Sequence, residues 1–229
     1  MMLAAPSSQS AAMSTFDPDE FSLPSAPTSR DGLFKLGSDM SLNACVNWRS
    51  PDWNLYATGY KTAADMLATH VVEHRIRQDT LVYPILFLYR QYIELALKEI
   101  IRSGLVYLER NRAAPKHHDL GQLWAMAEKL LAEICPGDSV PELKETGRII
   151  KELNKVDPQA DAFRYPVNKR GEQSLRGIRH IDIGNVREVA ARLAVMLDGA
   201  TTQIGVYQDW KYDMESYYGT PYDDMGPAY

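Results

Sequence analysis

Cysteine, long apolar runs and N-terminal basic residues are all scarce in this chain of 229 residues. Cys45 and Cys135 are its only thiols, which excludes a disulfide framework and a CxxC metal knuckle and favours a reducing, cytoplasmic location. The longest apolar run, residues 81–89, is far shorter than the roughly 20 residues of a membrane span. No Lys or Arg precedes Arg30, which argues against a secretory signal or a transit peptide. We therefore expect no membrane association.

The chain carries fewer basic than acidic residues and lacks the common enzyme motifs. The 25 Lys and Arg residues face 30 Asp and Glu residues, a net charge of −5, so the chain is not a generally basic nucleic-acid coat. The sequence holds no GxGxxG, P-loop, GxSxG or HExxH motif. His70 and His74 stand four residues apart, which suits either a metal pair or ordinary helix packing. We predict no metal site and no cofactor.

The two ends of the chain differ in composition from its middle. Ser, Pro and Ala fill 16 of the first 31 positions, which buries too little apolar surface to order a chain, so residues 1–40 are predicted to be disordered. Residues 209–229 hold five Tyr and five acidic residues against one Lys and are predicted to form an acidic, Tyr-rich tail. Residues 41–208 remain as the folded domain.

Apolar residues recur in this domain at steps of three and four, the period of an amphipathic helix. Five helices are predicted. The first begins at Ser50-Pro51, and the second runs from about residue 81 to Arg102 and is stopped by Gly104. The third begins with an Asp119–Gln122 capping box, the fourth covers residues 139–157, and the fifth begins at Asn185. Residues 163–183 break this rhythm. The sequence thus predicts an all-α bundle of about five helices with a short hairpin or irregular insertion before the last helix.

The second helix places Arg90, Glu94 and Lys98 in one row at steps of four. Such a row is either a solvated salt-bridge ladder or a covered row in the interior. Phe87 and Ile101 lie among these charges and favour the covered alternative, in which the row fixes packing or lines a pocket. Glu94 and Lys98 are candidate binding residues, and Arg90 is a candidate catalytic residue.

The insertion concentrates basic residues. It carries Arg164, Lys169, Arg170, Arg176 and Arg179 against Glu172 alone, interleaved with Phe163 and Tyr165. Cations beside aromatic rings suit single-stranded nucleic acid, through phosphate contacts and base stacking. They equally suit an acidic protein surface, including the chain's own tail, or a plain solvated loop. Arg164, Tyr165, Lys169, Arg170, Arg176 and Arg179 are the candidate binding residues of this segment.

Two adjacent histidines, His117 and His118, precede the third helix. They belong either to a capped helix start or to an anion site at a helix N-terminus, where free N–H groups favour phosphate. If the protein is an enzyme, these histidines are its candidate general acid and base.

Four segments in this order resemble the HEPN-like helical proteins: Pro84–Lys98, His118–Trp124, Phe163–Pro166 and Ile181–Val186. The resemblance covers about residues 50–208. It implies a bundle of four to five helices, often dimeric, in toxin–antitoxin pairs, phage defence or RNA processing. Active members are metal-independent ribonucleases with an Arg-x(4–6)-His motif on a late helix.

That motif is displaced here. Arg112 has the right spacing to His117 or His118 but precedes the third helix, and Arg176 to His180 is one residue short. The first hypothesis is therefore a non-catalytic HEPN-like domain that binds RNA, a nucleotide or a partner protein in a prokaryotic stress or defence role, and that forms a homodimer. The second is a metal-independent ribonuclease that uses His and Arg. The third is a structural homo-oligomeric assembly protein.

Overall fold

The computed structural model describes residues 24–46, 52–110, 113, 115–137 and 140–218. The chain divides into two units, Met1–Trp48 and Arg49–Tyr229. In the described part of the first unit, a short 3-10 helix, η2 (Met40–Leu42), is capped by the side chain of Asp39, and apolar side chains such as Phe34 are exposed. The predicted disorder of residues 1–40 concerns in large part residues 1–23, which lie outside the described residues.

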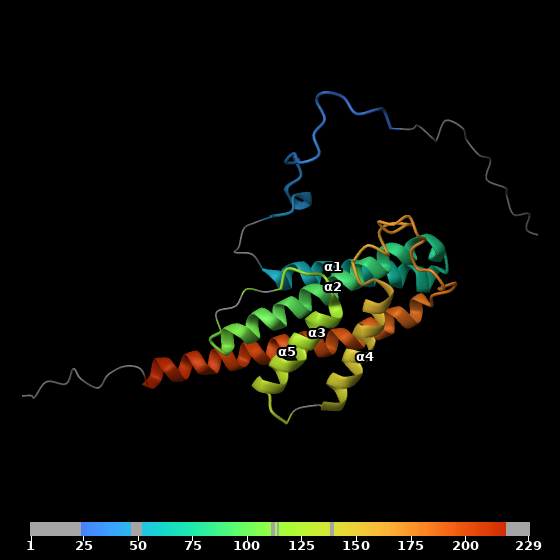
Figure 1. Ribbon diagram of the computed structural model, residues 1–229. Helices are drawn as coiled ribbons and strands as arrows, with labels where there is room; N and C mark the ends of the chain where they lie inside the picture. The colour runs from blue at the N-terminus through green and yellow to red at the C-terminus, as the bar shows by residue number, and fades with distance from the viewer. Residues whose placement is uncertain (1–23, 47–51, 111–112, 114, 138–139, 219–229) are drawn as a thin grey trace, which may run out of the picture. The chain divides into compact units, whose positions relative to one another are not determined.

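The second unit is an all-α bundle, as predicted. Its helices are α1 (Trp53–His74), α2 (Gln78–Tyr107), α3 (Leu120–Ile134), α4 (Val140–Val156) and α5 (Ile183–Tyr218) (Figure 1). The insertion before α5 holds one isolated antiparallel bridge, Val167 to Gln173, and no strand within the described residues. None of the described helices is both long enough and apolar enough to cross a lipid bilayer.

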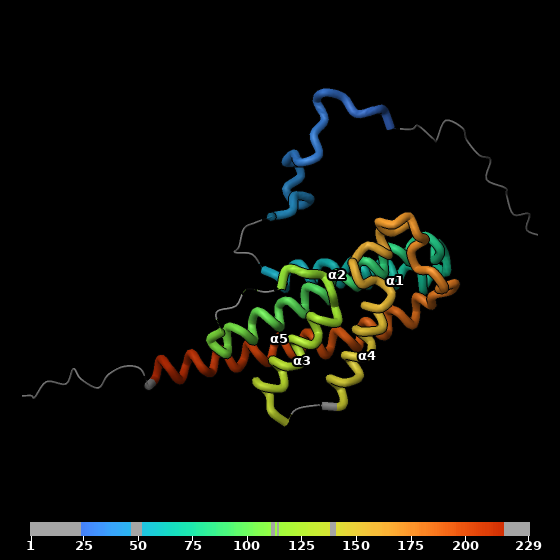
Figure 2. The backbone as a smooth tube through the Cα atoms, viewed as in Figure 1, coloured from blue at the N-terminus to red at the C-terminus, as the bar shows by residue number. Residues whose placement is uncertain are grey.

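Helix α2 is the central element of the bundle and contacts α1, α3 and α5. Figure 2 shows α1, α2 and α5 running along the length of the bundle, with α3 and α4 inclined to them. Two buried tyrosines of α2 hold its neighbours: Tyr89 donates to Asp65 of α1 at 2.7 Å, and Tyr92 donates to Asp198 of α5 at 2.8 Å. Burial raises the pKa of both hydroxyls, so they stay donors.

The N-terminal caps follow local side-chain chemistry. Helix α3 begins after Asp119, whose carboxylate accepts from Gln122 N at 2.9 Å, which confirms the predicted cap. Helix α1 is capped by Asp52, which accepts from the amides of residues 54 and 55; the predicted Ser50-Pro51 start lies outside the described residues. Helix α5 is preceded by Asp182, which accepts from Asn185 N, so Asn185 is not the cap that the sequence predicted.

Two predicted helix ends are wrong. Helix α2 does not stop at Gly104 but continues to Tyr107. Gly104 lies where α3 packs closely against α2, since a Cβ there would lie 3.2 Å from Ile134 Cδ1. Helix α5 continues through the first ten residues of the predicted tail to Tyr218. Contacts with the end of α2 hold this extension, since Gln208 donates to Ser103 O at 2.9 Å and Lys211 pairs with Glu109. Residues 219–229 lie outside the described residues.

We expect Gly147→Ala to lower the free energy of unfolding by about 1–3 kcal/mol, because a Cβ at this position of α4 would lie 2.3 Å from Nε1 of the buried Trp124 ring. Gly59→Ala in α1 is the matched control, since nothing lies within 4 Å of its Cβ position. Removing this helical glycine should raise stability by about 0.5–1 kcal/mol. Urea unfolding measures both. Equal effects of the two substitutions would contradict the close Trp124 contact.

Candidate functional site

The Arg90–Glu94–Lys98 row is buried. The three residues are 1%, 1% and 5% exposed. Arg90 Nη1 donates to Glu94 Oε2 at 2.9 Å, and Lys98 Nζ donates to Glu94 Oε1 at 2.8 Å. The covered alternative is therefore confirmed, whereas a solvated ladder is wrong. Glu94 and Lys98, the two candidate binding residues of the row, thus lie in the interior of the bundle, where their charged groups pair with each other and with Arg90.

Asp157, which no sequence signal marked as functional, completes this network at the end of α4. Arg90 Nε lies 3.0 Å from Asp157 Oδ2 in an ion pair and donates to the Asp157 carbonyl at 3.2 Å. Asp157 Oδ1 in turn accepts from the amides of Asp161 and Ala162 at 2.8 and 3.0 Å. The positive charges of Arg90 and Lys98 are thus balanced in the interior by the negative charges of two carboxylates, those of Glu94 and Asp157. The network thereby attaches the start of the insertion to α2.

Arg90 is closed off from a substrate by its burial. Its Nη2 donates to the backbone carbonyl of His118 at 2.7 Å, in addition to its contacts with Glu94 and Asp157, so three of its five N–H groups have acceptors inside the protein. An arginine that is 1% exposed and held by these partners fixes the packing of the segments around it, and it does not reach a phosphate group in solvent. The catalytic role predicted for Arg90 is therefore not supported by its surroundings.

His118 is the exposed end of the same network. Its Nδ1 lies 2.7 Å from Glu94 Oε1, and its side chain is 59% exposed. Burial by itself raises the pKa of Glu94, but hydrogen bonds with Lys98, His118 and Arg90 together hold that pKa below its ordinary value of 4.5. His117 does not join the network, and its buried Nδ1 has no hydrogen-bond partner among the described residues. The structure thus brings only one of the two candidate histidines to Arg90 and Glu94.

Arg164, the first basic residue of the insertion, lies against two aromatic rings. Arg164 Nε donates to Ala160 O at 2.6 Å. Its guanidinium lies 5.8 Å from the ring centroid of Phe87 in α2 and 5.5 Å from that of Tyr165. Tyr165 itself is 56% exposed. A cation and an aromatic ring are thus held side by side at the surface.

The remaining basic side chains of the insertion point to solvent without partners. Lys169, Arg170, Arg176 and Arg179 are exposed and make no ion pair within the described part of the chain. The backbone that carries Lys169 and Arg170 forms a tight turn, in which Asn168 Oδ1 accepts from Arg170 N and Glu172 N. These five cations of one segment, which we call the basic loop, are all exposed: Arg164, Lys169, Arg170, Arg176 and Arg179.

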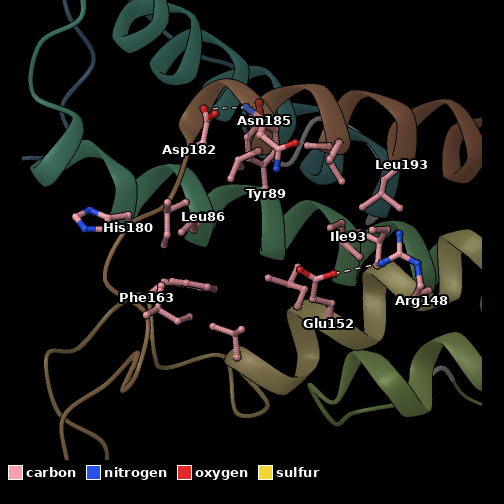
Figure 3. Close-up of a pocket in the computed structure, with 18 residues that line it drawn as sticks. Leu86, Tyr89, Ile93, Arg148, Glu152, Phe163, His180, Asp182, Asn185 and Leu193 are labelled. Atoms are coloured by element: carbon pink, nitrogen blue, oxygen red, sulfur yellow. Dashed lines mark hydrogen bonds and ion pairs between the residues drawn. The ribbon is translucent and has the colours of Figure 1, made fainter.

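A groove of about 600 Å³ opens beside the basic loop, between α2, α4 and α5 (Figure 3). Its apolar residues include Leu86 and Ile93 of α2, Leu193 of α5 and Phe163 of the insertion. Its polar edges carry an Arg148–Glu152 ion pair at 3.5 Å and, at the start of α5, the Asp182–Asn185 contact.

A second pocket, of about 470 Å³, lies under the basic loop on the other side of residues 178–181. Tyr83, Tyr165, Arg179, His180 and Ser174 are among the residues that line it. No sequence pattern marked Tyr83 or Ser174 as a site residue, because the pocket joins the first turns of α2 to a loop about 90 positions later in the chain.

Within the described residues, no three His, Cys, Asp or Glu side chains converge as a metal-binding group. His70 and His74 lie with ring centroids 4.7 Å apart on α1. Comparisons with protein-family models, with curated proteins and with solved structures give no match. The HEPN-like resemblance therefore stays a prediction from sequence motifs.

We expect Glu94→Gln to lower the free energy of unfolding by about 3–5 kcal/mol, because it leaves Arg90 and Lys98 buried with too little negative charge. Glu145→Gln is the control. It removes a carboxylate from an ion pair with Arg148 in which both side chains are more than half exposed, so unfolding should be nearly unchanged. Urea unfolding measures both variants. Similar midpoints for the two would show that the buried row contributes little.

The same carboxylate should make stability depend on acid pH. Because the pKa of Glu94 is lower in the folded chain than in the unfolded one, its contribution is present above the unfolded pKa and is lost as pH falls through the folded pKa. Unfolding free energies of the native chain should therefore fall more steeply than those of Glu94→Gln between about pH 5 and pH 3. Parallel curves would contradict this linkage.

Proposed function

We propose that the helical bundle is a non-catalytic module that binds single-stranded RNA through the basic loop. The observation that carries the proposal is the cluster of five unpaired or ring-stacked cations on one ordered loop of an otherwise acidic chain. The net charge of the whole chain is −5, so the basic loop is a local concentration of positive charge that can attract phosphate groups. The stress or defence setting implied by the HEPN-like resemblance is part of the same proposal.

The aromatic residues of the loop favour a single strand over a duplex. Tyr165 and Tyr83 line the pocket under the loop, where Arg179 also lies, and each of these tyrosines is about half exposed. Unpaired bases can stack on exposed rings while neighbouring cations contact the backbone, whereas the bases of a duplex are already stacked on each other. The pocket volume of about 470 Å³ falls within the range of small-ligand sites and is large enough for one nucleotide.

The buried network supports binding rather than cleavage. Glu94 orients the His118 imidazole, as a carboxylate orients a general base. A ribonuclease also needs a cation or a set of donors to stabilise the charge that develops on the phosphate. Arg90, the cation beside His118, has its donors directed at Glu94, Asp157 and the His118 carbonyl.

Replacing Arg164, Arg170 and Arg176 together with Ala should weaken binding to a labelled single-stranded RNA oligonucleotide by about tenfold or more. The slope of log affinity against log salt should also become shallower by about 2, since each lost phosphate contact on a single strand contributes about 0.7. Gel shift or fluorescence anisotropy over a salt series, with EDTA present, measures both quantities. The same gels report whether the RNA stays intact.

The matched control replaces Lys129, Lys144 and Lys151, three exposed lysines of α3 and α4, with Ala. It changes the net charge equally but leaves the basic loop untouched, so affinity should stay close to that of the native chain. Equal losses of RNA affinity in the two triple variants would show that the loss follows from the overall charge of the chain and not from the basic loop. Unchanged affinity in the loop variant would overturn the proposal, and metal-independent cleavage that His118→Ala abolishes would replace it with the ribonuclease.

A further inference from the structure

The groove between α2, α4 and α5 has an apolar interior. Leu86 and Ile93 of α2 and Leu193 of α5 are buried and line it. Helix α4 packs mainly against α3 and contacts α5 only weakly, so the side of α4 that carries Ile149 and Leu153 forms a wall of the groove. The three helices thus enclose an apolar hollow, in contrast to a flat apolar face.

The groove has the size of a small-molecule site. It extends along α2 from Leu86 to Ile93 and along α5 from Asn185 to Leu193, which is about 11–12 Å at 1.5 Å per residue. Its volume of about 600 Å³ lies within the range of about 300–1,000 Å³ that ligand sites occupy. Two turns of a partner helix, about 11 Å long and 10 Å across, would need roughly 800 Å³. The dimensions therefore favour a small molecule over a helix of another protein.

The charged side chains at the edge of the groove already have partners. Arg148 Nε donates to Glu145 Oε2 at 2.8 Å, and Arg148 Nη1 lies 3.5 Å from Glu152 Oε2. Asp182 Oδ1 accepts from Asn185 N at 3.1 Å at the start of α5, where the helix dipole stabilises a negative charge. Every arginine and carboxylate among the described lining residues is therefore balanced within the protein.

Two polar side chains of the lining remain free for a ligand. Those of His180 and Asn185 make no hydrogen bond within the described part of the chain, whereas the Tyr89 hydroxyl donates to Asp65. Figure 3 shows His180 at one end of the groove and Leu193 at the other. An amide and an imidazole can each hydrogen-bond to an uncharged polar atom. The groove thus combines a long apolar part with a few hydrogen-bonding groups.

We propose that this groove binds an uncharged, mainly apolar small molecule whose hydrogen-bonding group lies near His180 and Asn185. The apolar interior accommodates the body of the ligand. A charged group at the edge would lose water without gaining a counter-ion, since the charges there are already paired. None of the five cations of the basic loop lines the groove, so the inference is independent of RNA binding.

Nile red, an uncharged dye that fluoresces strongly in apolar surroundings, tests the site in the full chain. Its fluorescence should saturate at one dye molecule per native chain. Val189→Trp places an indole ring in the groove from α5 and should weaken dye binding by about tenfold or more, because the ring occupies the space of the ligand. Val195→Trp is the matched control on the same helix. Val195 is 76% exposed and lies outside the groove, so this variant should keep the native affinity.

A second blocking variant, Ile149→Trp, fills the groove from α4. Circular dichroism and urea unfolding check that each variant keeps the native fold. Dye fluorescence that does not saturate with the native chain would overturn the inference. The same holds if a folded blocking variant binds the dye as tightly as Val195→Trp, because the dye would then lie outside the groove.

The absence of charge in the ligand is tested separately on the native chain. Decanol, decanoate and decylammonium share one apolar tail and differ in the charge of the head group. Decanol should displace Nile red at the lowest concentration, and the two charged molecules should need about tenfold more, because neither finds an unpaired counter-ion. Displacement by decanoate or decylammonium at the same concentration as decanol would overturn the assignment of an uncharged ligand.

Discussion

The guanidinium of Arg90 is the group around which the bundle and its insertion are organised. It joins Glu94 on its own helix to Asp157 at the end of α4 and to the backbone before α3. Each contact is made by a residue that would be costly to bury alone. The central helix, the start of α3 and the first turn of the insertion are therefore held in one arrangement by a single set of charges.

This arrangement explains how an acidic protein can present a small basic surface. The Asp157 carboxylate orders the amides of Asp161 and Ala162, and the chain then passes directly to Arg164 and the basic loop. The residues that resemble catalytic groups thus support the surface proposed to bind RNA, rather than contacting the ligand themselves.

The sequence by itself determined the helices, their approximate order and the Asp119 cap, because apolar spacing and capping are local properties of the chain. It also located the basic loop, whose residues lie close together in the chain. Only the tertiary structure decided that Arg90 is buried and paired with Asp157, which lies 67 residues later in the chain. It also decided that α2 passes Gly104 and that α5 continues to Tyr218, since packing between distant helices outweighs local stop signals. Burial and ion pairing depend on which segments meet in space, and residue spacing along one chain does not contain that information.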